Sequence, residues 1–146
     1  MILLGSKASQ LVQCALRLSR PSMLGSAVSK FHGSSCRQDI FNIQDKDDFE
    51  ERVLKSGKPV LIDFHAKWCN PCKQLTPRLE EALQQFKDDV HLAKVDIDDN
   101  DDLAMDYQVS AVPVVFAIKG GKVADKFIGL QDSDRITSFI RGLVDK

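Results

Sequence analysis

Two cysteines separated by two residues are the feature of this chain best suited to chemistry. Cys69 and Cys72 form the motif Cys-Asn-Pro-Cys, and such a pair can be half of a zinc site, a structural disulfide or a redox-active dithiol. Zinc is disfavoured because it needs four ligands, and the sequence offers no second pair and no matching set around His65 and His91. A structural disulfide is disfavoured because closing so short a loop removes little entropy from the unfolded chain. We therefore favour redox chemistry.

The position of Cys69 supports this interpretation. The apolar run 60–65 is typical of a buried strand, and the periodicity after it of a helix, so Cys69 falls at their junction. The free N–H groups and the dipole at a helix start favour a thiolate there. Cys72, one turn further on, should be less exposed and suits the second step of exchange. Pro71 occupies a first-turn position where its missing N–H does no harm, and the spacer Asn70 brings no charge.

The rest of the sequence must supply the scaffold that holds this junction. Apolar runs predict strands at about 39–43, 60–65, 91–97, 112–118 and 122–128, and apolar steps of three and four predict helices at about 45–56, 72–86, 101–107 and 133–144. Asp45 and Asp132 are candidate helix caps. Gly120-Gly121 predicts a tight hairpin, so the last two strands should be antiparallel. The order β-α-β-α-β-α-β-β-α indicates a three-layer α/β domain.

The first 38 residues have the composition of a targeting segment. They contain eight serines and five basic residues but no Asp or Glu, which is typical of mitochondrial transit peptides. A secretory signal is a weaker alternative, because it needs roughly 7 to 15 consecutive apolar residues. A helix docked on the domain would not explain the missing acids. We therefore predict a transit peptide at 1–38, cleaved between about 31 and 39, import into the mitochondrial matrix, and a folded domain at 39–146.

The remaining 108 residues are acidic, with 15 basic and 21 acidic side chains. Nucleic-acid binding is disfavoured because an acidic domain repels phosphate. Membrane insertion is not expected, since no stretch has the roughly 20 consecutive apolar residues that a transmembrane helix needs. Acids between Asp96 and Asp102 are similar to a calcium loop in composition, but Gly at the sixth position and Glu at the twelfth are missing. We expect these acids to cap the short helix at 101–107 and to face solvent.

The stretch 60–72, Val-Leu-Ile-Asp-Phe-His-Ala-Lys-Trp-Cys-Asn-Pro-Cys, resembles the active-site stretch of thioredoxins. The resemblance extends from about Phe41 to Val144 and includes Pro77, Lys94, Val112-Pro113, Gly120-Gly121 and Gly129. It implies the thioredoxin fold, a central mixed sheet of about five strands flanked by about four helices. His65 and Asn70 depart from the family, which usually has an aromatic residue and Gly at these positions; the departures bear on the redox potential and the packing behind the site.

The resemblance also implies roles for residues around the cysteines. Asp63 would be a buried carboxylate whose pKa is raised by desolvation, so that it accepts a proton from Cys72. Periodicity alone would equally allow an Asp at the exposed end of its strand. Lys94 would neighbour Asp63 from the next strand and pair with it, the alternative being a surface lysine. Pro113 would follow a cis peptide bond facing the cysteines, leaving the backbone of Val112 free for an extended substrate segment.

Trp68, beside the nucleophile, could be a core residue or an exposed contact. Next to a reactive thiol we favour an exposed apolar platform for a partner protein. The residues expected to share this platform are Pro71, Val112, Pro113 and Gly129.

The function implied by the resemblance is thiol–disulfide exchange through Cys69 and Cys72, as a protein-disulfide reductase supporting mitochondrial redox homeostasis. The implied partners are disulfide-containing proteins, among them peroxiredoxins, and a thioredoxin reductase that supplies electrons from NADPH through its FAD. We expect no bound cofactor, no metal and a monomer. Two alternatives stay open: a disulfide oxidase or isomerase, and a binding module whose partner is held by the reduced fold and released on oxidation.

Overall fold

The computed structural model describes residues 40–86 and 89–145, so the predicted transit peptide at 1–38 lies outside the described residues. Strands and helices follow the predicted order, with one turn of π-helix after the first helix. Their bounds are β1 (Ile40–Asn42), α1 (Lys46–Phe49), the π-helix η1 (Glu50–Leu54), β2 (Val60–His65), α2 (Asn70–Leu83), β3 (His91–Asp96), α3 (Asp101–Asp106), β4 (Val114–Lys119), β5 (Lys122–Ile128) and α4 (Ser133–Val144).

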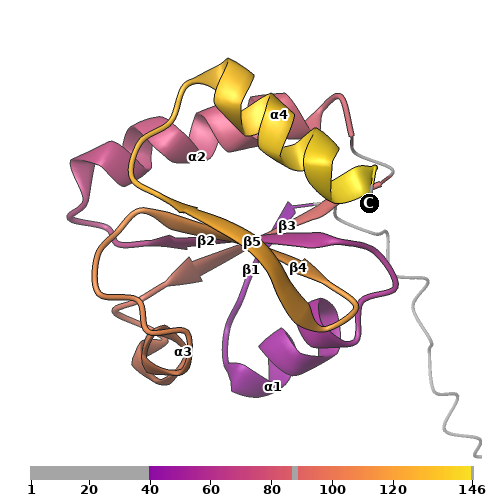
Figure 1. Ribbon diagram of the computed structural model, residues 1–146. Helices are drawn as coiled ribbons and strands as arrows, with labels where there is room; N and C mark the ends of the chain where they lie inside the picture. Colours follow the sequence, from indigo (N-terminus) through magenta and orange to yellow (C-terminus); the bar gives the residue numbers. More distant parts are fainter. Residues whose placement is uncertain (1–39, 87–88, 146) are drawn as a thin grey trace, which may run out of the picture. The chain divides into compact units, whose positions relative to one another are not determined.

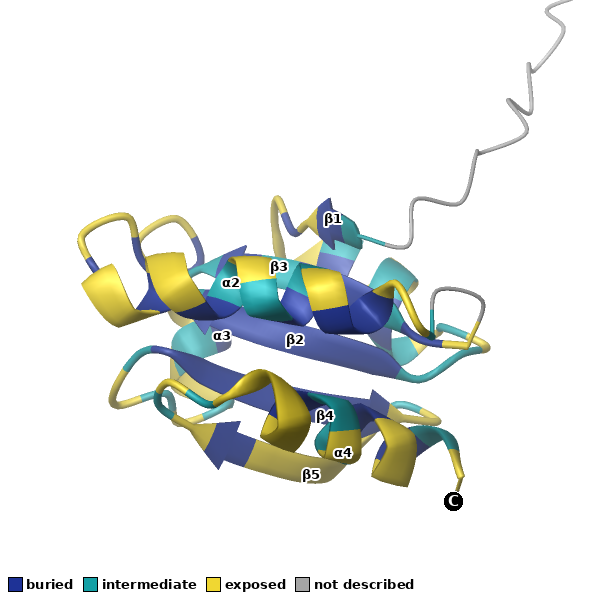
Figure 2. Ribbon diagram, turned by 90° about the horizontal axis from the view of Figure 1, so that it is seen from above, coloured by how far each residue is buried: buried dark blue, intermediate teal, exposed yellow. Residues whose placement is uncertain are grey.

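The strands form one mixed sheet in the order β1-β3-β2-β4-β5. β1 and β2 both run parallel to β3, whereas β4 runs antiparallel to β2 and to β5. The antiparallel pairing of the last two strands is confirmed. β2 lies at the centre of the sheet and is buried over 60–64, because strands flank it on both edges and side chains cover both of its faces. Figure 2 shows β2 as a buried band between its neighbours β3 and β4 in the sheet.

Helices cover both faces of the sheet, which confirms the three-layer α/β arrangement. α2 and α4 lie on one face, and α1 and α3 lie on the other (Figure 1). Side chains of β2 alternate between the two faces, so that Leu61 packs with Leu75 and Leu79 of α2. Phe64 and its even-numbered neighbours pack toward α1 and α3 in the other core cluster. Asp63 therefore points to the α2 side of β2.

Local signals place the ends of several elements. The Asp45 carboxylate accepts a hydrogen bond from the Asp48 N–H at 2.8 Å, and the Asp132 carboxylate accepts one from the Arg135 N–H at 2.8 Å, so both predicted caps are confirmed. β4 begins at Val114, two residues later than predicted. Pro113 has no N–H to donate to a strand ladder, which explains the later start.

None of the helices in the described ranges is both long and apolar enough to cross a bilayer.

Candidate active site

Cys69 and Cys72 are joined by a disulfide at the start of α2. Cys69 is the N-cap residue of that helix, and the Cys72 backbone N–H donates to the Cys69 sulfur at 3.2 Å. Pro71 lies in the first turn, where no N–H is needed. A helix N-terminus favours negative charge, so the same N–H would stabilise a Cys69 thiolate once the disulfide is reduced. The predicted junction of strand and helix is therefore present.

Both cysteines are buried in this oxidised state. Cys69 is 4% exposed and Cys72 2%, so Cys72 is the less exposed of the two, as predicted, although both side chains are almost inaccessible to solvent. The reason is local packing: Ala66 lies in the same cluster as the two cysteines, and Ile97 and Val112 pack against it.

Asp63 is completely buried beneath the site, which settles the choice between a buried and an exposed carboxylate. Its Oδ2 accepts a hydrogen bond from the Thr76 hydroxyl at 2.8 Å, while Oδ1 has no hydrogen-bond partner among the described residues. Burial raises the pKa of Asp63 above its ordinary value, because the charged form loses hydration. The Thr76 hydrogen bond opposes this shift, and so do the charges of His65 and Lys94.

Lys94 occupies the predicted position but has a different partner. It stands directly beside Asp63 in the β2–β3 register. Its ammonium, however, forms an ion pair with Glu80 of α2 at 3.0 Å, so the prediction that Lys94 pairs with Asp63 is wrong. Glu80 lies near the surface, and an ammonium that pairs there keeps part of its hydration. Lys94 acts on Asp63 through its charge rather than through a hydrogen bond.

Thr76 is the site residue that the sequence reasoning missed. It lies on α2 one turn after Cys72 and next to the buried positions Leu75 and Leu79. A signal was available, because steps of three and four from Cys72 place residue 76 on the stripe that faces the sheet.

The segment before β4 lies against the cysteines as expected. The Val112–Pro113 peptide bond is cis, and Val112 packs on the cysteine cluster. The backbone of Val112 makes no hydrogen bond with another residue of the described chain. Pro113 accepts a hydrogen bond from the Gly129 N–H at 2.8 Å. Gly129 has a φ of +85°, a conformation that glycine adopts readily and other residues avoid.

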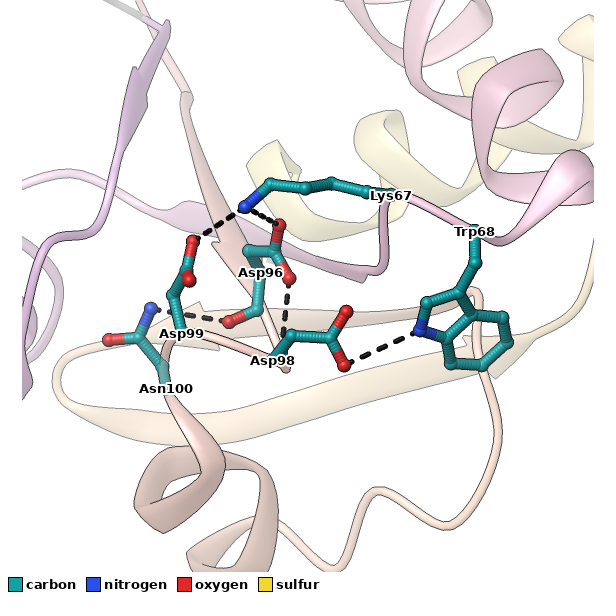
Figure 3. A network of polar contacts seen from close by, with 6 residues as sticks. All are labelled: Lys67, Trp68, Asp96, Asp98, Asp99 and Asn100. Atoms are coloured by element: carbon teal, nitrogen blue, oxygen red, sulfur yellow. Dashed lines mark hydrogen bonds and ion pairs between the residues drawn. The ribbon is translucent and has the colours of Figure 1, made fainter.

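Trp68 is 66% exposed, which confirms that it is not a core residue. Figure 3 shows its indole turned toward the acidic turn after β3, where Nε1–H donates to Asp98 Oδ1 at 3.4 Å. The adjacent Lys67 pairs with Asp96 at 3.5 Å and with Asp99 at 3.1 Å. This turn therefore supports the loop that carries Trp68.

The acids of this turn do not cap α3, contrary to the prediction. Its N-cap residue is Asn100, which makes no capping hydrogen bond through its side chain. The Asn100 amide instead donates to the Asp96 carbonyl at 3.2 Å. The described ranges contain no group of three or more His, Cys, Asp or Glu side chains placed to hold a metal ion.

Comparison with known proteins assigns the chain to a family. Residues 40–142 match the thioredoxin family model. The chain is 51% identical over 114 residues to a protein of Rattus norvegicus named "Thioredoxin, mitochondrial", covering 78% of this chain and 69% of the rat protein. It is 54% identical over 104 residues to the protein of that name from Mus musculus, covering 71% of this chain and 63% of the mouse protein.

A more distant relative matches over a larger share of both chains. The "Probable thioredoxin-2" of Caenorhabditis elegans is 40% identical over 125 residues, which is 86% of each protein. Together with the five-stranded mixed sheet and the disulfide at the start of α2, these matches confirm the predicted fold. The chain belongs to the thioredoxin family of thiol–disulfide oxidoreductases.

Proposed function

We propose that this protein reduces disulfides in other proteins through Cys69 and Cys72. The observation that carries the proposal is the position of the Cys69–Cys72 disulfide at the start of α2, on the sheet face that also holds the buried Asp63. The pair can alternate between a disulfide and two thiols, and the helix start favours the thiolate that begins exchange.

The reaction has two displacements. The Cys69 thiolate attacks one sulfur of a substrate disulfide, which forms a mixed disulfide and expels the other substrate sulfur as a thiolate. Asp63 then accepts the proton of the Cys72 thiol, and the Cys72 thiolate attacks the Cys69 sulfur. The mixed disulfide breaks, the second substrate sulfur leaves as a thiolate, and the two substrate thiolates take up protons. The substrate gains two electrons and the protein is left with the Cys69–Cys72 disulfide.

The exposed surface near Cys69 supplies the binding contacts. Trp68 offers a large apolar face beside the nucleophile, and Pro71 is exposed next to it. The free backbone groups of Val112 can pair with an extended substrate segment, as a strand edge does. Gly129 holds Pro113 in place from the next strand end.

Electrons reach the protein from a partner. A flavin-containing thioredoxin reductase would reduce the Cys69–Cys72 disulfide with NADPH, so this chain needs neither a bound cofactor nor a metal. Peroxiredoxins are the proposed main substrates, and the protein acts as a monomer. Family membership supports reductase and disulfide substrates as the classes of partner.

The proposed location is the mitochondrial matrix. Two observations support it: relatives at 51% and 54% identity are named mitochondrial thioredoxins, and residues 1–38 have eight serines and five basic residues without an acid. A fusion of 1–38 to a fluorescent reporter should enter mitochondria, and the same fusion with Arg17→Glu and Arg20→Glu should not. A diffuse signal from the unaltered fusion would contradict the proposal.

Turnover of a defined disulfide tests the function. The full chain, supplied with thioredoxin reductase and NADPH, should reduce insulin, and a Cys14→Ser/Cys36→Ser variant should do so at the same rate. Cys69→Ser in that background should have no activity. Full activity of Cys69→Ser would contradict the mechanism. A redox potential close to those of disulfide oxidants would instead favour the oxidase or isomerase function.

A further inference from the structure

We propose that Thr76 is a positioning residue for disulfide exchange: its hydroxyl holds Oδ2 of Asp63, which leaves Oδ1 as the oxygen that takes the Cys72 proton. The inference rests on the proposed function, in which Asp63 is the base. It adds a residue and assigns separate tasks to the two carboxylate oxygens.

The geometry carries the inference. The Thr76 hydroxyl lies 2.8 Å from Asp63 Oδ2, and Oδ1 is buried without a hydrogen-bond partner among the described residues. A buried polar atom without a protein partner is rare in folded proteins, and strain, a role in chemistry or a bound water can account for one. Asp63 itself is fully buried, so among the described residues the Thr76 hydroxyl provides its hydrogen bond.

Thr76 belongs to the same helix as the resolving cysteine. It follows Cys72 by four residues on α2, which places the two side chains on one helix face. Leu75 and Leu79 of α2 belong to the same hydrophobic core cluster as Leu61 of β2, so this side of α2 is packed against the sheet. The hydroxyl, the Cys72 sulfur and the carboxylate are therefore held by two rigid elements rather than by loops.

The local sequence is unfavourable for a helix at this point. Thr76 is β-branched and precedes Pro77, and a residue before proline is biased away from helical backbone angles. A threonine inside a helix often donates to a carbonyl of its own preceding turn. Thr76 instead donates across to Asp63 of β2. A residue that breaks local preference while serving a buried group is the kind expected at a functional site.

Other groups around Asp63 act at longer range. His65 from its own strand and Lys94 from β3 favour the carboxylate through their charges, and Glu80 from α2 opposes it. On the β4 side its register partner is the apolar, buried Val115. Burial raises the pKa of Asp63, and the Thr76 hydrogen bond is the largest of the influences that lower it.

The proposed step combines one proton transfer, from Cys72 to Asp63, with the exchange of one disulfide bond at Cys69. The Cys72 S–H proton passes to Oδ1 of Asp63 while Thr76 continues to donate to Oδ2. The Cys72 thiolate then forms a bond to the Cys69 sulfur and the bond between Cys69 and the substrate sulfur breaks. Without the hydroxyl, the carboxylate takes up protons more readily from solvent and is less often available as a base.

The test compares release rates as a function of pH. Single-turnover release of an insulin thiol from the Cys69 mixed disulfide is measured in the full chain for the wild type, Thr76→Val and Thr76→Ser. Below the pKa of Asp63, Thr76→Val should slow release about tenfold, the usual effect of losing a hydrogen bond to a charged group. The rates should converge at high pH, and Thr76→Ser should follow the wild type.

A matched control is available on another helix. Thr137 of α4 donates to the Ser133 carbonyl of its own helix at 2.8 Å, so Thr137→Val removes a similar hydroxyl and should leave the profile unchanged. Thr76→Ala, which adds no methyl group, should show the same change as Thr76→Val and replaces it if that variant does not fold. A Thr76→Val or Thr76→Ala rate that equals the wild type, or is slower by one factor at every pH, overturns the proposal.

Asp63→Asn separates this inference from the function on which it rests. If Asp63 is the base, Asp63→Asn removes the pH step, and adding Thr76→Val to it changes nothing further. A wild-type pH profile in Asp63→Asn would refute the base itself. An Asp63→Asn effect without a Thr76→Val effect would leave the base in place and reject only the role of Thr76.

Discussion

Replacing Asp63 by Asn should make the protein more stable at neutral pH, by an amount that depends on pH. Asp63 is fully buried, and burial raises its pKa above the ordinary value of 3.8. Between that value and the raised one, the folded protein holds a proton that the unfolded chain has lost. The unfolding free energy of the wild type therefore falls as pH rises through this interval, whereas the amide introduced by Asp63→Asn does not titrate.

The pH dependence of this stability difference is limited by the single proton that Asp63 binds. The difference in bound protons between the two states reaches at most one, so the stability of Asp63→Asn relative to wild type rises by at most about 1.4 kcal/mol for each pH unit. With a urea m-value of about 1–3 kcal/mol/M, that slope moves the relative midpoint by roughly 0.5 to 1.4 M for each pH unit. The relative stability becomes constant once the pH exceeds the pKa of Asp63 in the folded protein.

The assay is urea unfolding of both oxidised proteins from pH 3 to pH 9. The amide side chain of the variant keeps an acceptor for the Thr76 hydroxyl and is nearly the same size, so it adds only an offset that does not change with pH. Titrating groups that do not interact with Asp63 contribute equally to both proteins and cancel in the difference. A difference that stays flat across this range, or a wild type that gains on the variant as pH rises, would refute the reasoning.

Four further substitutions test other parts of the account. Two of them test the stability of the fold, and two test the contact that Trp68 makes with a substrate. Asp132→Ala should lower the unfolding free energy by about 1 kcal/mol in urea unfolding, because the carboxylate caps α4 through the Arg135 N–H. Leu79→Ala should cost about 2–5 kcal/mol in the same assay, since Leu79 is completely buried. Trp68→Ala should raise the KM for insulin roughly tenfold or more with a smaller effect on kcat, as loss of a large aromatic contact does. Asp98→Ala should raise KM less, because Trp68 then loses only its hydrogen bond to the Asp98 carboxylate and keeps its apolar face. An Asp98→Ala effect larger than that of Trp68→Ala would contradict this order.

Much of the fold follows from short-range signals. β2, β5 and α4 have the predicted bounds, because a continuous apolar run, a Gly-Gly turn and an Asp cap each act within a few residues. The strand order was beyond such signals. That β4 lies antiparallel beside β2 depends on pairing between segments about fifty residues apart, which no local pattern encodes.

The chemistry of the site could be predicted from residue types and spacing. The hydrogen-bond and ion-pair partners of its side chains could not, because they depend on the packing of the fold. A C-x-x-C pair before a helix indicates redox chemistry whatever surrounds it. Lys94 had two carboxylates within reach, and the one near the surface is its partner because full burial of the ammonium would cost hydration. Thr76 could be placed on the correct helix face, but its hydrogen bond to Asp63 depends on how closely α2 approaches β2.

Identification of the sulfur that carries the substrate tests the central claim most directly. In a Cys14→Ser/Cys36→Ser background, the reduced Cys72→Ser protein is mixed with insulin, and the adduct is located by mass spectrometry of the peptides. The account predicts a stable mixed disulfide at Cys69 with Cys72→Ser, and no adduct at Cys72 with Cys69→Ser. An adduct that accumulates at Cys72 when Cys69 is replaced, at a rate matching wild-type turnover, would contradict it.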